Sequence, residues 1–247
     1  MTLSDHVVAV LQARTGSTRL PGKVLADVAG RSMLARVCER LGRAGTIGRV
    51  IVATTTEPAD RAVAAECARL GVPCFRGSEW DVLGRYHGAA TSCGAEIVVR
   101  VTADCPLIDP EVVDRVVLAF LDARPDYASN TLERTWPRGL DTEVFPAAAL
   151  ARAHREARLP HEREHVTPHF YCGPQQFRLQ PVTGPGRLGH LRWTVDTPDD
   201  LRLIRAIYAR LGPDGSFSWR DAARLFDREP QLAELNRHVR QKPLVAA

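Results

Sequence analysis

A loop that combines cations, glycines and hydroxyl groups follows the first apolar run of the sequence. It spans residues 12–23 (QARTGSTRLPGK) and carries Arg14, Arg19 and Lys23 together with two glycines and three hydroxyl side chains. Glycines let the backbone approach a ligand with free N–H groups, arginines offer forked donors, and lysine offers a compact, mobile charge. These properties suit a polyphosphate. The alternative is a solvated basic loop.

The spacing within this loop differs from two common phosphate-binding motifs. Five residues rather than four separate Gly16 from Gly22, and Val24 stands where a Walker A loop has its magnesium-binding Ser or Thr. The dinucleotide-binding pattern G-x-G-x-x-G does not occur in the loop. The loop is therefore a candidate phosphate site of another kind.

Two aspartates follow predicted strands that are far apart in the sequence. Asp104 comes after the run EIVVRVT at 96–102, and Asp196 follows a predicted strand at 191–195. If both strands belong to one parallel sheet, both carboxylates lie at its ligand-binding edge, beside the basic loop. Two carboxylates that face a triphosphate suit Mg²⁺, which prefers a few protein oxygens, the phosphates and water. The alternative for each aspartate alone is a helix cap ahead of a nearby proline.

A further pattern, His161-Glu162-Arg163-Glu164-His165, matches the H-E-x-x-H motif of zinc proteases. Prolines at 160 and 168 leave room for only a short helix, and no Gly and His follow at metzincin spacing. We therefore reject a zinc site. We interpret the segment as a short exposed helix whose His165 can still face a ligand.

Apolar runs that alternate with helical patterns must position these residues. Near-continuous apolar runs predict strands covered on both faces at 6–11, 49–54, 72–75 and 96–102. Apolar residues at helical spacing predict helices at 32–41, 60–70, 81–93 and 110–123. This alternation is typical of βαβ units around a mostly parallel sheet.

The regular alternation stops after residue 125. Extended segments are predicted at 127–132, 141–145 and 177–182, and a turn at 136–139. Helical pieces are predicted at 146–158 and 161–167, and a Gly/Pro-rich loop at 184–189. We interpret this part as an insertion or lid. The pattern resumes with a strand at 191–195 and a capped helix at 200–211, and two short helices are predicted at 218–227 and 230–239.

The composition excludes several classes of protein. The 247 residues are 45% hydrophobic and 25% charged, which is typical of a globular chain and not of a disordered or collagen-like one. No stretch approaches the roughly 18 uncharged apolar residues of a membrane span. Asp5 precedes any long apolar run, so a secretory signal is not expected either. We therefore expect a cytoplasmic protein with no membrane partner.

Charge and cysteine usage bear on two further properties, nucleic-acid binding and disulfide bonding. The net charge is +4, but acids are interleaved with the arginines along the chain, so nucleic-acid binding is not expected. The six cysteines form no C-x-x-C pair in a chain too long to depend on disulfides, and we expect reduced thiols. Among the 33 basic residues only Lys23 and Lys242 are lysines, which singles out both positions.

Several segments together resemble the cytidylyltransferase superfamily, which includes the synthetases that activate 3-deoxy-manno-octulosonate and sialic acid as CMP conjugates. They are QARTGSTRLPGKVLADVAGRSML, VVRVTADCPLIDP, RGLDTEVF, EREHVTPHF and RWTVDTPDDL. The resemblance is greatest to the spore-coat-polysaccharide branch and extends over nearly all of 1–211. It implies an α/β fold of the nucleotide-diphosphosugar-transferase type, with a Rossmann-like, mixed, mostly parallel sheet, helices on both faces and a middle insertion.

The resemblance also implies a division of the chain. We expect one cytidylyltransferase-like domain at 1–211, in which about 125–190 carries the acceptor site and the dimer contacts, followed by a C-terminal helical extension at 212–247. Superfamily members are often homodimers, and we expect a homodimer here.

Individual residues receive roles from the resemblance. The nucleotide is expected to contact Ala13, Arg14, Gly16, Ser17, Arg19, Lys23, Arg76, Gly77, Ser78 and Thr102. Asp104 and Asp196 are expected to hold Mg²⁺, and with Arg14, Arg19 and Lys23 they form the expected catalytic set. Acceptor contacts are expected from Asn130, Arg138, Asp141, Glu143 and His165.

The implied reaction is transfer of CMP from CTP to a small acidic acceptor, such as a sugar acid, with release of pyrophosphate. An acceptor oxygen would attack the α-phosphorus in line, while the metal and the cations neutralise charge. Residues 130–145 depart from the octulosonate and sialic-acid patterns, so a phosphonate or another small anion could replace the sugar acid as acceptor. Two different functions stay open beside this reaction: a metal-dependent glycosyltransferase that uses a nucleotide sugar, and a non-catalytic nucleotide-binding protein.

Overall fold

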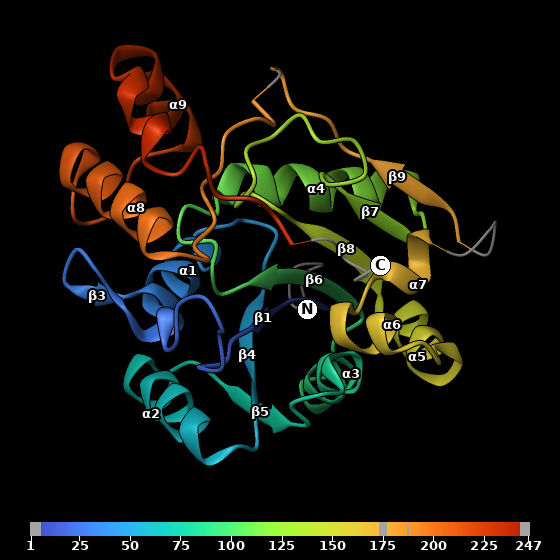
Figure 1. The fold of residues 1–247 in the computed structure, drawn as a ribbon. Helices are drawn as coiled ribbons and strands as arrows, with labels where there is room; N and C mark the ends of the chain where they lie inside the picture. The colour runs from blue at the N-terminus through green and yellow to red at the C-terminus, as the bar shows by residue number, and fades with distance from the viewer. Residues whose placement is uncertain (1–5, 173–176, 187, 243–247) are drawn as a thin grey trace.

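A mixed sheet forms the centre of the computed structural model, which describes residues 6–172, 177–186 and 188–242. Within these residues the sheet has seven strands in the order β5-β4-β1-β6-β8-β7-β9. The strands are β1 (Val7–Gln12), β4 (Arg49–Thr55), β5 (Cys74–Gly77), β6 (Ile97–Thr102), β7 (Tyr127–Ser129), β8 (Glu143–Pro146) and β9 (Leu179–Pro181). The predicted α/β class with a mixed, mostly parallel sheet is confirmed (Figure 1).

The strands of the first half run parallel, and the strand order reverses beside β1. From β1 the chain builds outward through β4 and β5 on one side and then returns to place β6 on the other side. Gln12, at the end of β1, pairs with Ala53 of β4 and Thr102 of β6. In open α/β sheets ligands bind at such a reversal, outside the carboxyl ends of the strands. The loop after β1 and Asp104 after β6 both lie at this edge.

The middle segment, expected as an insertion, widens the sheet. β8 runs antiparallel to both β6 and β7, and β9 pairs with β7 in parallel. The strand predicted at 191–195 is wrong, because this segment makes only a single bridge, between Arg138 and Arg192, and joins no ladder of the sheet. Its apolar residues are buried by side-chain packing instead, which an apolar run alone does not distinguish from a buried strand.

Helices cover both faces of the sheet. They are α1 (Met33–Leu41), α2 (Arg61–Leu70), α3 (Val82–Ser92), α4 (Pro110–Ala123), α5 (Ala147–Glu156), α6 (Pro160–His165), α7 (Pro168–Tyr171), α8 (Pro198–Leu211) and α9 (Trp219–Arg228), with short 3₁₀ turns η2 (Lys23–Leu25), η3 (Pro58–Asp60) and η4 (Pro230–Leu235). Side chains of β1 alternate between the faces: Val7 and Leu11 pack in a cluster with α1, α2 and α4, and Val8 and Val10 pack in a cluster with α3 and α5.

A separate apolar cluster lies at one end of the molecule, under α8 and α9. Trp136 and Trp193, both almost fully buried, belong to it together with Ile204, Tyr208 and Leu225. This cluster anchors the segment before Asp196 and the C-terminal helices to the same body. The described part of the chain contains no helix that is both long and apolar enough to cross a membrane.

A small hairpin was not predicted. β2 (Asp27–Val28) and β3 (Arg31–Ser32) pair antiparallel through Ala29 and Gly30, which have φ values of 54° and 81°. Two successive positive φ values are typical of a type I′ turn, for which Asn-Gly is the usual sequence signal. Ala-Gly does not carry that signal.

Candidate active site at the carboxyl edge of the sheet

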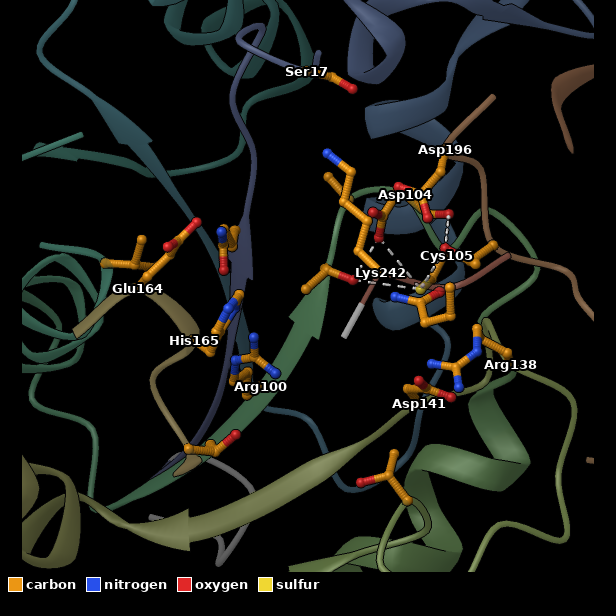
Figure 2. A pocket seen from close by; sticks show the side chains of 18 of the residues that line it. Ser17, Arg100, Asp104, Cys105, Arg138, Asp141, Glu164, His165, Asp196 and Lys242 are labelled. Carbon is orange, nitrogen blue, oxygen red and sulfur yellow. Dashed lines mark hydrogen bonds between the residues drawn. The ribbon is translucent and has the colours of Figure 1, made fainter. Parts of the chain in front are cut away.

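A cavity of about 880 Å³ opens at the carboxyl ends of β1 and β6 (Figure 2). This volume is at the large end of the range of about 300–1,000 Å³ for small-molecule sites. Most of the residues predicted from the sequence line it: Arg14, Gly16, Ser17, Arg19, Lys23, Thr102, Asp104, Arg138, Asp141, Glu143, His165 and Asp196. We name the two ends of the cavity after the roles that the resemblance implies. The nucleotide end is formed by the loop at 12–23, Asp104 and Asp196, and the acceptor end is formed by Arg100, Arg134, Arg138, Asp141 and Glu143.

Asp60 holds the loop of the nucleotide end in shape. Its Oδ1 accepts hydrogen bonds from the backbone N–H and the hydroxyl of Thr15, both at 2.7 Å, and its Oδ2 accepts from the Thr55 hydroxyl. Burial would raise the pKa of Asp60, but the bonds from Thr55 and Thr15 outweigh burial and lower it. Gly22, at a φ of +71°, donates its N–H to the Thr15 carbonyl at 2.9 Å and closes the loop.

Lys23 joins this loop to both aspartates. Its Nζ donates to Asp104 Oδ2 at 2.8 Å, to Asp196 Oδ1 at 2.8 Å and to the Val195 carbonyl at 2.7 Å. Burial alone would lower the pKa of Lys23, but the two carboxylates outweigh burial and raise it. All three ammonium hydrogens are thus directed at oxygens of the protein. In this arrangement Lys23 positions the carboxylates.

Asp196 reaches Asp104 by packing of an extended segment and not as the end of a sheet strand. The Val195 N–H donates to the Asp104 carbonyl at 2.8 Å, and the Trp193 N–H donates to the Arg138 carbonyl at 2.7 Å. Gly139 makes this approach possible: its φ is +111°, and a Cβ there would lie 2.6 Å from the Trp193 carbonyl carbon. The segments at 104, 138–139 and 193–196 are therefore fixed against one another.

Cations surround Asp196. Its Oδ2 accepts from Arg192 at 2.6 Å and pairs with Arg19 at 2.9 Å, while Lys23 holds the other oxygen. Burial would raise the pKa of Asp196, but Lys23, Arg192 and Arg19 together lower it to about 2. Asp104 is bound on its other oxygen by the hydroxyl of Thr102.

The two aspartates fit a magnesium site in type and placement. One oxygen of each carboxylate lies 2.8 Å from the same point, the Lys23 ammonium, and the side chains of Asp104 and Asp196 are 23% and 15% exposed. Across residues 6–172, 177–186 and 188–242 no group of three or more His, Cys, Asp and Glu side chains could hold a metal. Two carboxylates leave the remaining positions of an octahedral ion to phosphates and water, as Mg²⁺ prefers. A cation entering between them must share the oxygens with Lys23 or displace its ammonium.

Ion pairs line the acceptor end. Arg100 donates to Glu143 at 2.8 Å, and Arg134 holds Asp141 with two bonds of 2.7 and 3.0 Å. The Arg138 side chain makes no hydrogen bond or ion pair with any residue that the structure describes. Burial, with the charges of Arg134 and Arg192, lowers the pKa of Arg138, although an arginine remains charged. The acceptor end thus offers a half-buried guanidinium to an anion.

His165 lies at the same end of the cavity, next to Glu164 on the short helix α6 (Figure 2). The H-E-x-x-H segment lies in α6, which is six residues long, and its Glu162 accepts hydrogen bonds from the backbone N–H groups of Arg158 and Leu159. Glu162 also bonds His169 Nδ1 at 2.9 Å. Through these contacts Glu162 stabilises the N-terminal end of α6.

Five of the predicted contact residues lie outside the cavity lining. They are Ala13, Arg76, Gly77, Ser78 and Asn130. Arg76 is turned toward the backbone carbonyls of Thr55 and Glu57, at 2.9 and 3.0 Å. Asn130 is buried and lies outside the cavity, and both ends of its amide bond the backbone of Leu140 and Thr142.

The cavity also contains residues that were not predicted. Arg100 and Arg134 form the ion pairs of the acceptor end, and Lys242 lies in the lining together with Gln241. A signal existed for two of them. Arg100 is the one charge inside an apolar strand run, and Lys242 is one of only two lysines.

Comparisons of sequence and structure show which known proteins this chain resembles. A family model described as cytidylyltransferase matches residues 8–212. A spore coat polysaccharide biosynthesis protein of Bacillus subtilis is 31% identical over 93% of this chain and 97% of its own length. A 3-deoxy-manno-octulosonate cytidylyltransferase of Anaeromyxobacter dehalogenans is 33% identical over 83% of this chain and 98% of its own length. A solved cytidylyltransferase structure from Leptospira borgpetersenii has a TM-score of 0.89 at 31% identity and covers 96% of this chain and 99% of that one.

Proposed function

Because the chain belongs to the cytidylyltransferase family and is a CTP-dependent nucleotidyltransferase, we propose that it transfers CMP from CTP to a small acidic acceptor and releases pyrophosphate. The observation that carries this proposal is a single cavity with two different ends. A cationic, glycine-containing loop and two carboxylates form one end, and a guanidinium free to bind an anion forms the other.

The nucleotide end supports binding of the triphosphate. Arg14, Gly16, Ser17 and Arg19 line the cavity at the loop that Asp60 holds in shape. Their donors can neutralise the phosphates and stabilise the charge that grows on the departing pyrophosphate. Lys23 contributes by keeping Asp104 and Asp196 together, and it can turn toward a phosphate when a cation takes its place between them.

Asp104 and Asp196 are the residues that would hold Mg²⁺. When bound, the ion supplies positive charge at the α-phosphate and helps to align the two substrates. The remaining contribution of the protein is positioning, since phosphoryl-type transfer gains most from alignment and charge neutralisation. The segment 193–196 fixes Asp196 against Asp104 before any substrate is bound.

The acceptor end supports an acidic acceptor. Arg100 and Arg134 are already neutralised by Glu143 and Asp141, whereas Arg138 faces the cavity without such a partner among the described residues. A carboxylate can pair with a guanidinium through two parallel hydrogen bonds, which gives orientation as well as affinity. A sugar acid is the acceptor class that we propose, and a phosphonate would satisfy the same guanidinium.

A coupled pyrophosphate-release assay tests the proposal. CTP, UTP, ATP and GTP are crossed with sugar acids, neutral sugars and phosphonates in the presence of Mg²⁺, and each reaction is repeated with EDTA. We expect release with CTP and an acidic acceptor, abolished by EDTA. Silence across the panel, with CTP still raising the melting temperature, would overturn group transfer and leave a nucleotide-binding protein.

Assembly as a homodimer and a place in polysaccharide precursor synthesis belong to the same proposal. The names of the relatives support the second point. Light scattering on the purified protein tests the first, with twice the monomer mass of 27.2 kDa as the expected result.

A further inference from the structure

The chain after η4 returns to the loop of the nucleotide end. Figure 1 shows this segment (dark red) running from α9 back across the middle of the molecule. Its anchor is Asn236, which is 4% exposed and donates to Asp200 Oδ1 at 2.8 Å and to the Arg192 carbonyl at 3.0 Å. Arg192 and Asp200 are themselves bonded to each other beside Asp196. The anchor is therefore attached to the network that holds Asp196.

Three contacts beyond the anchor reach the cavity. Arg19 donates to the Arg240 carbonyl at 3.3 Å, and Arg192 donates to Gln241 Oε1 at 2.8 Å. Lys242 Nζ donates to the hydroxyl of Thr18, in the loop at 12–23, at 3.2 Å. Gln241 and Lys242 line the cavity, and Figure 2 shows Lys242 among the side chains of Asp104, Cys105 and Asp196.

The two lysines of the chain thus line the same cavity but have different surroundings. Lys23 is buried, and its ammonium is bonded to two carboxylates and a carbonyl. Lys242 is exposed, and the only partner the structure gives its ammonium among the described residues is one neutral hydroxyl. A hydroxyl leaves the positive charge uncompensated and at least one N–H available. An oxyanion bound at the loop at 12–23 would lie near the Lys242 ammonium, because this ammonium bonds Thr18 of that loop.

We propose that Lys242 is a further phosphate-binding residue. It belongs to the C-terminal segment 236–242, which contacts the loop at 12–23 through Arg19 and Thr18. Lys242 contacts the terminal phosphates of the nucleoside triphosphate and the pyrophosphate that leaves, because its ammonium lies at Thr18 and not at the acceptor end. This inference rests on the proposed function, since it requires that CTP binds with its triphosphate on the loop at 12–23.

Binding measurements on three full-length variants test the inference. Lys242→Ala, Lys242→Arg and the control Arg237→Ala are titrated calorimetrically with CTP, CMP and inorganic pyrophosphate, each with Mg²⁺ and without acceptor. Arg237 is a matched control because it belongs to the same segment, and its exposed side chain pairs with Glu234. The melting temperature of each variant reports whether the fold is retained.

We expect Lys242→Ala to weaken CTP and pyrophosphate about tenfold, as the loss of a charge-assisted hydrogen bond predicts, and to leave CMP within about twofold. Lys242→Arg should recover most of the affinity, and Arg237→Ala should bind like the wild type. Unchanged CTP affinity in Lys242→Ala, or an equal loss for CTP and CMP, would overturn the inference while the proposed function stands. Wild-type protein that binds no CTP would instead overturn the proposed function and the inference with it.

Discussion

The two ends of the cavity are built in different ways. At the nucleotide end, one continuous network of charges joins segments more than 80 residues apart in sequence. Its members are Arg19, Lys23, Asp104, Arg192 and Asp196. At the acceptor end, the two ion pairs share no charged member. Arg134 pairs with Asp141 in the same loop, and Arg100 pairs with Glu143 on the neighbouring strand of the sheet.

This difference predicts which residues of the cavity tolerate substitution. Loss of one member of the nucleotide network leaves other buried charges without a partner, which is costly in a low-dielectric site. Loss of one member of an acceptor pair leaves a single charge without its ion-pair partner. The acceptor end can therefore be altered to take another anion while the nucleotide end is kept, and the comparison yields four tests.

The largest effect is expected from Asp104→Asn, which breaks the nucleotide end. The variant loses one of the two carboxylates available to Mg²⁺, and we expect kcat for pyrophosphate release to fall about a hundredfold or more. Steady-state kinetics at saturating Mg²⁺ measure this. Asp199→Asn is the control, because Asp199 pairs with Arg202 and His238 and does not line the cavity. Turnover near the wild-type level would contradict the metal assignment.

Arg138→Gln tests the acceptor end alone. The variant loses the guanidinium, which has no ion-pair partner among the described residues, and keeps a polar side chain. We expect the KM for the acceptor to rise about 30-fold while the KM for CTP stays within about twofold. Arg178→Gln, on an exposed arginine that pairs with Asp126, serves as the control. An equal rise in both KM values would show that the two ends are not independent.

The acid stability of the protein tests the charge network of Asp196. Its folded-state pKa of about 2 lies below the unfolded value of 3.8, so the unfolded chain binds more protons as the pH falls. The network therefore contributes about 2 kcal/mol of stability above pH 5, which is lost progressively between about pH 5 and pH 2. Urea unfolding at pH 6 and pH 3 measures the loss. The decrease should be smaller, by about 1 kcal/mol, in Asp196→Asn, and equal decreases would contradict the assigned network.

The smallest effect is expected from Asp60→Asn, which changes the support of the loop at the nucleotide end. Asparagine keeps the carbonyl oxygen that accepts from Thr15, and the Thr55 hydroxyl can rotate to accept from the new amide. We expect the KM for CTP to rise about fivefold with no change in the acceptor KM. A change confined to the acceptor KM would place Asp60 in the wrong end of the cavity.

Much of the fold follows from local patterns in the sequence. The strands near 7–12, 49–55 and 97–102 and the helices α1 to α4 lie close to their predicted positions, because buried parallel strands and amphipathic helices have distinct periods. The strand at 191–195 was predicted wrongly. Trp193 and Val195 are buried by α8 and α9 and not by neighbouring strands, and an apolar run looks the same in both settings.

The candidate site also has parts that the sequence predicts and parts that it does not. The cationic loop at 12–23 and the place of Asp104 after β6 could be predicted from the sequence, because loops at strand ends are set by the order of elements along the chain. Three features are visible only in the folded chain: Lys23 binds both aspartates, Asn130 is buried against backbone, and Arg138 and Lys242 line one cavity. The physical reason is that these contacts join segments distant in sequence. Packing around Gly139, Trp193 and Asn236 brings them together, and no local period or spacing records it.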